Sequence, residues 1–118
     1  MKLKLLLWVL GLLLKRAFRR DPEFRAQLET RSLDWGVATE DLSIARHYRM
    51  SREGVTSGTG LPVDTELELR FADAESAVAF LLKPSPKAFL NGMMEQRVRL
   101  VGDSAQLNRL QSLLKRIR

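Results

Sequence analysis

The first 20 residues constrain the fold of this chain more than any other part of it. An unbroken apolar run extends from Leu5 to Leu14, with basic residues on both sides and no acidic residue. The basic residues of this segment are Lys2, Lys4, Lys15, Arg16, Arg19 and Arg20. The net charge of the whole chain is +6, so the remainder of the chain is neutral overall. A helix that is apolar on nearly all sides must be covered by protein or by lipid.

Four interpretations of this segment stay open. As an α-helix, Leu5–Leu14 spans about 15 Å, roughly half of the hydrocarbon core of a bilayer. The segment fits a helix in the membrane interface, with Trp8 near the headgroups, or a helix packed on the domain and covering a pocket. A true membrane span and an export signal are the other two, although Lys15–Arg20 is a poor cleavage site.

The position of the excess charge indicates an anionic membrane surface as a partner. Nucleic-acid-binding domains usually spread basic residues over a folded face and interleave them with aromatic side chains. Here the basic residues flank an apolar run instead, so nucleic acid is not expected as a partner. The predicted membrane-contact residues are Lys2, Lys4, Trp8, Lys15, Arg16, Arg19 and Arg20.

The rest of the chain reads as one mixed α and β domain. Alternating apolar residues predict strands at Leu33–Ala38, Ile44–Met50, Val55–Thr59, Thr65–Phe71 and Gln96–Val101, although Arg46 breaks the apolar face of the second. Asp21 is expected to cap a short helix, and Asp73 a helix whose Val78, Leu81 and Leu82 face inward. Ser85 opens a further helix that Gly92 closes, and Asp103 or Ser104 caps a final leucine-rich helix.

The order of these elements resembles the sterol carrier protein 2 family. The resemblance is carried by Asp64–Phe71, the helix that follows, Phe89 with Gly92, the strand ending at Val101, and the Gly102-Asp103 turn before the last helix. It covers roughly residues 21–118 and is strongest from Asp64 onward. Gly92 and Gly102 are further apart than in common members, so residues 93–96 are expected to remodel the rim of a pocket.

The resemblance implies an α+β fold: a five-stranded, largely antiparallel sheet, covered by helices and enclosing an apolar tunnel. Residues 21–118 would form this domain and residues 1–20 an added apolar N-terminal helix. Members of the family bind sterols, fatty acyl chains, phospholipids or isoprenoid tails, and each methylene removed from water contributes about 0.8 kcal/mol. The candidate lipid-binding residues are Phe71, Val78, Leu81, Leu82, Phe89, Met93, Met94, Leu110, Leu113 and Leu114, all of which would otherwise pack the core.

The expected function is non-catalytic binding or carriage of a lipid, fatty acyl or isoprenoid ligand at a membrane surface. The alternative is an interaction or scaffold subunit of a membrane-associated complex, for example one of lipid or quinone biosynthesis. A homodimer or a protein partner could form through the N-terminal helix. The chain has no cysteine, and its single histidine, His47, leaves no histidine pair for a metal site. His47 is expected to be a solvated or hydrogen-bonded strand residue, so no enzymatic reaction is expected, and no cofactor. The expected location is the cytoplasm, peripheral to the membrane.

Overall fold

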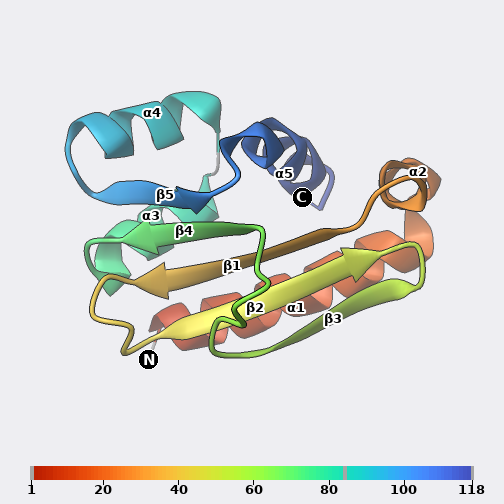
Figure 1. Ribbon diagram of the computed structural model, residues 1–118, viewed down its shortest axis with the longest axis horizontal. Coiled ribbons are helices and arrows are strands. Elements are labelled where there is room, and N and C mark those ends of the chain that lie inside the picture. Colours follow the sequence, from red (N-terminus) through yellow and green to blue (C-terminus); the bar gives the residue numbers. More distant parts are fainter. Residues whose placement is uncertain (1, 84, 118) are drawn as a thin grey trace.

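The computed structural model describes residues 2–83 and 85–117 as one sheet with helices packed on it (Figure 1). The elements in chain order are α1 (Lys2–Arg20), α2 (Pro22–Glu29), β1 (Leu33–Thr39), β2 (Ala45–Ser51), β3 (Gly54–Thr59), β4 (Leu67–Phe71), α3 (Ala74–Leu82), α4 (Pro86–Met94), β5 (Val98–Gly102), a 3-10 turn (Ser104–Gln106) and α5 (Leu107–Lys115).

The sheet has the strand order β3-β2-β1-β4-β5. The central pair, β1 and β4, is parallel, and the other three pairs are antiparallel. This confirms the predicted five-stranded, largely antiparallel sheet. Residues that lie side by side across the strands face the same way, and in the middle row Trp35 of β1 lies between Tyr48 of β2 and Leu67 of β4. All three side chains are fully buried, and the rings of Trp35 and Tyr48 stack with centroids 4.7 Å apart.

Helix α1 packs on the sheet and contributes to the same core. Its buried side chains recur at alternating spacings of four and three residues, which is one face of a helix. They are Leu3, Leu7, Leu10, Leu14 and Ala17. Figure 1 shows α1 running along β2 and β3. Gly11 lies where the helix packs closely on these two strands. A Cβ atom on Gly11 would be 3.2 Å from Ser57 Oγ and 3.5 Å from a ring carbon of Tyr48.

The structure buries one face of α1 in the core and leaves Leu5, Trp8 and Leu12 exposed. Of the four interpretations, the structure shows the helix packed on the domain. Within residues 2–83 and 85–117, no helix combines the length and the apolar character that a membrane span requires.

Helices α3 and α4 differ from the expectation in one detail each. The inward residues of α3 are Ala77 and Phe80, whereas Val78 and Leu81 are only partly buried and Leu82 is 56% exposed. The predicted inward face was therefore wrong for Leu82, while Val78 and Leu81 pack against the core. The helix is apolar around most of its circumference, so its sequence period does not select one side.

Gly92 lies inside α4, which continues to Met94, so the prediction that Gly92 closes this helix was also wrong. A Cβ atom at position 92 would be 2.7 Å from Val98 Cγ1. The glycine is thus explained by close packing of α4 on β5, and not by the end of a helix. The predicted caps at Asp21 and Asp73 are confirmed, since each carboxylate accepts from the backbone of the helix that it precedes. Asp103 caps the 3-10 turn Ser104–Gln106, whereas α5 begins at Leu107 without a side-chain cap, so the predicted cap of the last helix lies one short turn earlier.

The opposite face of the sheet carries charged side chains and a crossing loop. Arg49 of β2 forms ion pairs with Asp34 at 3.3 Å and with Asp64 at 2.9 Å. Leu61, from the loop between β3 and β4, covers Gly36, where a Cβ atom would be 2.3 Å from a methyl carbon of Leu61. The apolar surfaces that could hold a lipid therefore lie on the side of the helices.

Candidate functional site

A hollow lined only by hydrocarbon side chains lies between α1, α3 and α5. We call it the apolar groove, and its lining residues are Leu6, Val9, Leu10, Leu13, Leu81, Leu82, Leu114 and Ile117. Its volume is about 210 Å³. Pockets that enclose a whole drug-sized ligand usually measure about 300–1,000 Å³. In this conformation the groove therefore has room for part of a long apolar chain.

The apolar groove is continuous with three exposed apolar side chains on the outer side of α1. These are Leu5, Trp8 and Leu12, which are 61%, 52% and 45% exposed, and we call them the exposed stripe. Residues three or four apart are neighbours on a helix surface. Val9 of the groove is therefore adjacent to both Leu5 and Leu12, so an apolar chain could pass from the stripe into the groove without crossing a charged side chain.

Basic residues surround the exposed stripe along the helix. All of the predicted membrane-contact residues are exposed, and they are Lys2, Lys4, Trp8, Lys15, Arg16, Arg19 and Arg20. The helix holds no acid to neutralise them. Such a face combines an apolar centre with positive ends, which is the composition of helices that lie in the interface of anionic membranes.

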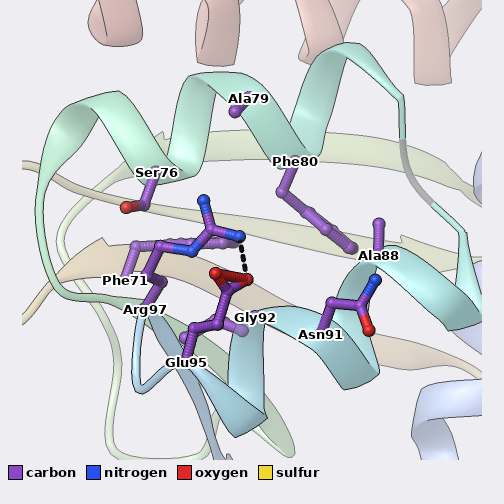
Figure 2. Close-up of a pocket in the computed structure, with 10 residues that line it drawn as sticks. Phe71, Ser76, Ala79, Phe80, Ala88, Asn91, Gly92, Glu95 and Arg97 are labelled. Carbon is purple, nitrogen blue, oxygen red and sulfur yellow. Dashed lines mark hydrogen bonds and ion pairs between the residues drawn. The ribbon is translucent and has the colours of Figure 1, made fainter.

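A second hollow lies between α3, α4 and the adjoining strands β4 and β5, and we call it the α3–α4 pocket (Figure 2). Its volume is about 240 Å³. Phe71 and Phe80 form its inner wall, with ring centroids 5.7 Å apart. At its rim Glu95 accepts a hydrogen bond from Arg97, and Figure 2 shows this ion pair in front of Phe71. Glu95 belongs to the segment 93–96 that was expected to remodel a pocket rim.

The ten predicted lipid-binding residues do not come together in a single cavity. Leu81, Leu82 and Leu114 line the apolar groove, whereas Phe71 lines the α3–α4 pocket. Buried in the core are Phe89, Leu110 and Leu113, and Val78 is partly buried against it. Met93 and Met94, which are 44% and 75% exposed, project from α4 and line neither hollow.

Sequence reasoning missed half of the apolar groove. The residues Leu6, Val9, Leu10 and Leu13 come from α1, which was assigned to a segment separate from the domain. The leucine run is apolar at nearly every position, so its spacing gave no signal for the side of the helix that packs on the domain. Among the described residues the expected apolar tunnel is not seen, since the apolar groove and the α3–α4 pocket are both open at the surface.

Comparison with solved structures identifies the fold. The sequence matches no protein-family model and no curated protein. In contrast, 17 chains of solved structures match the fold. A UbiJ-SCP2 ubiquinone synthesis protein superimposes with a TM-score of 0.71 at 14% identity, over 98% of this chain and 97% of its own. A conserved hypothetical protein from Thermus thermophilus, described as possibly a sterol carrier protein, gives 0.59 at 16% identity, over 92% of this chain and 82% of its own.

Part of a larger enzyme has a similar structure. The sec-alkylsulfatase Pisa1 from Pseudomonas sp. matches 75% of this chain with a TM-score of 0.57 at 13% identity. The matched region is 14% of that enzyme. At these identities the likeness concerns the fold and not the activity, and a shared fold alone does not specify a function. The resemblance seen in the order of elements is therefore confirmed by the structure: the chain has the fold of the sterol carrier protein 2 family.

Proposed function

We propose that this protein binds a lipid, fatty acyl or isoprenoid chain without catalysing a reaction, and that it acts at an anionic membrane surface in the cytoplasm. The observation that carries the proposal is the continuity of the apolar groove with the exposed stripe of α1. A groove that opens onto an apolar stripe between basic residues lets a chain move from the bilayer into the protein while it stays out of water. Each methylene that stays out of water is worth about 0.8 kcal/mol.

The fold comparison supports this class of ligand. One protein of the same fold is named a sterol carrier protein candidate and another a ubiquinone synthesis protein. We therefore include isoprenoid chains among the ligands to be tested beside fatty acids and phospholipids.

A binding role rather than catalysis is also consistent with the state of the single histidine. His47 lies on β2, where its Nδ1 is 3.0 Å from the backbone carbonyl oxygen of Gly60. This hydrogen bond requires the proton on Nδ1 and fixes the ring against the following loop. The proposal gives His47 this structural role.

Native mass spectrometry with lipid extraction, performed on the purified full-length protein, tests the proposal. We expect a near-stoichiometric apolar species that leaves when Val9 of the groove is replaced in Val9→Glu. The matched control is Leu90→Glu on α4, which places the same charge at a side chain that is already 57% exposed and outside the groove.

A chain that purifies without ligand and takes up no added fatty acid, phospholipid or isoprenoid would contradict the carrier proposal. The exposed stripe would then be better explained as a contact for a partner helix. In that case the protein would be an interaction subunit of a membrane-associated complex.

A further inference from the structure

Arg46 interrupts the apolar face of β2, and the structure places it on the side covered by α1. In the sheet register it lies between Val37 of β1 and Thr59 of β3, one row from the stacked Trp35 and Tyr48. Arginine is rarely buried in an apolar layer unless it is paired. A charged side chain at this position therefore requires a reason other than packing.

Arg46 lines a hollow beside the N-terminal half of α1, which we call the basic hollow. Its lining residues are Lys4, Leu7, Leu42, Ser43, Ile44, Ala45, Arg46, Thr59 and Gly60. Its volume is about 350 Å³. Two cationic side chains and two hydroxyl groups thus meet above an apolar floor, and no lining residue carries a carboxylate.

The hydrogen bonds of Arg46 are incomplete. Its Nη2 donates to Ser57 Oγ at 3.0 Å, and its buried Nε has no acceptor. Among residues 2–83 and 85–117 it forms no ion pair. Arg49, three positions further along on the opposite face of the same strand, pairs with two carboxylates. Burying part of a guanidinium without a counter-ion costs free energy. A bound anion beside Arg46 would recover part of that free energy.

The nearest acid in the lining loop does not supply that anion. The Asp41 carboxylate accepts hydrogen bonds from Thr39 Oγ1 at 2.7 Å and from the Ser43 hydroxyl at 2.8 Å. The Ser43 backbone amide also donates to this carboxylate, and this bond, with those from the Thr39 and Ser43 hydroxyl groups, holds the pKa of Asp41 below its ordinary value and ties the carboxylate to its own loop.

We infer that the basic hollow binds the anionic head group, a carboxylate or a phosphate, of an amphipathic lipid. A guanidinium presents donors in a planar fork that matches both groups, and the Lys4 ammonium adds a second positive charge. The apolar floor of Leu7, Leu42 and Ile44 suits the first carbons of the attached chain. The inference rests on the proposed lipid-binding function and goes beyond it, because the basic hollow shares no lining residue with the apolar groove.

Four soluble probes test it at constant ionic strength, with binding followed by amide chemical shifts and calorimetry. Octanoate supplies a carboxylate, dihexanoyl phosphatidic acid a phosphate, octanol a neutral group of the same chain length as octanoate, and inorganic phosphate an anion with no chain. The variant is Arg46→Gln. The matched control is Arg52→Gln, which removes the same charge in the exposed turn after β2, about 20 Å along the chain from Arg46.

We expect the native protein to bind at least one anionic lipid probe about tenfold or more tightly than octanol, as for a charge-assisted hydrogen-bonded pair. Arg46→Gln should lose this preference and Arg52→Gln should keep it. A preference for octanoate alone assigns a carboxylate, and a preference for phosphatidic acid alone assigns a phosphate. If Arg46→Gln does not fold, Arg46→Met keeps the apolar stem of the side chain and serves in its place.

Equal binding of octanol and both anionic lipids, or equal behaviour of the two arginine variants, would overturn the inference. The proposed function would survive that result, because octanol would still bind in the apolar groove. Conversely, binding of inorganic phosphate that depends on Arg46, together with no binding of octanol, would support the basic hollow and contradict the apolar-ligand function.

Discussion

The hydroxyl group of Tyr48 donates a hydrogen bond to the backbone carbonyl of Leu7, with 2.6 Å between the two oxygens. In an α-helix this carbonyl also accepts from the amide of residue 11, and its second lone pair is available for the hydroxyl. Residue 11 is a glycine, so no side chain separates the helix from the Tyr48 ring. The bond therefore joins α1 to the middle of the sheet between two residues that are 41 positions apart in sequence.

Replacing Tyr48 by phenylalanine should weaken the docking of α1. The aromatic ring and its stacking on Trp35 remain, while the hydroxyl that bonds Leu7 is lost. We expect the free energy of unfolding to fall by about 1 kcal/mol, since the Leu7 carbonyl keeps its helical partner. Urea denaturation followed by circular dichroism measures the change. A Tyr48→Phe protein as stable as the native one would show that this bond adds nothing to the docking.

The same hydroxyl predicts a loss of stability in alkaline solution. Burial raises the pKa of Tyr48 above its ordinary value of about 10, an effect that nearby Arg46 opposes in part. Above pH 10 the unfolded chain releases this proton while the folded chain retains it, so the stability that the buried phenol supplies is lost as the pH rises. The native protein should lose stability relative to Tyr48→Phe by about 1 kcal/mol per pH unit in this range. Parallel stability curves for the two proteins from pH 9 to 11 would contradict this assignment.

The sequence predicted secondary structure best where one face of an element is buried and the other is exposed to solvent. Alternation at Leu67, Leu69 and Phe71 predicted β4, because a half-buried strand separates its side chains by face. Caps such as Asp73 marked helix starts for an equally local reason, the need to satisfy the first amides of a helix. Local sequence patterns therefore predict most strands of the sheet and the first residues of the helices.

Apolar helices were the part that could not be predicted. Residues of α1 and α3 are apolar around most of the helix, so the hydrophobic period does not show which side meets the sheet. Leu82 was expected to face inward and is exposed, while Val9 was placed in a separate segment and lines the apolar groove. The burial of those residues depends on tertiary contacts, such as the close approach at Gly11. Such contacts cannot be predicted from the local sequence.

Gly102 should tolerate no side chain. Its φ is +101°, and a Cβ atom there would be 2.3 Å from the backbone carbonyl oxygen of Glu66. Backbone strain of about 1–3 kcal/mol then adds to a clash that backbone atoms cannot relieve cheaply. We expect Gly102→Ala to lower the free energy of unfolding by about 3 kcal/mol or more, measured by urea denaturation.

Gly60 provides the matched control for that substitution. Its φ is also positive, at +84°, and a Cβ atom would meet nothing within 4 Å. Gly60→Ala should therefore cost only the conformational strain, about 1 kcal/mol. Equal losses in the two variants would mean that strain alone, and not the contact with Glu66, explains the glycine at position 102.

The proposed membrane role of α1 is best tested by substitutions and not by truncation. Deleting residues 1–20 would remove core side chains such as Leu7 and Leu14, so lost vesicle binding could reflect lost folding. The exposed stripe offers a cleaner test, because Leu5, Trp8 and Leu12 are about half exposed and their replacement leaves the core intact. The triple variant Leu5→Gln, Trp8→Gln, Leu12→Gln should unfold at nearly the same urea concentration as the native protein.

Vesicle binding should respond to both the stripe and the charge around it. Each stripe side chain contributes about 1 kcal/mol when half of its apolar surface leaves water, so the triple variant should bind anionic vesicles roughly a hundredfold more weakly. The control, Leu90→Gln with Met94→Gln, removes exposed apolar groups from α4 and should bind as the native protein does. Added salt should weaken native binding, because basic residues such as Lys15 and Arg19 act through a screened attraction. Sedimentation with vesicles of phosphatidylglycerol measures all three effects. If the triple variant still sediments fully, the exposed stripe of α1 is not the contact with the membrane.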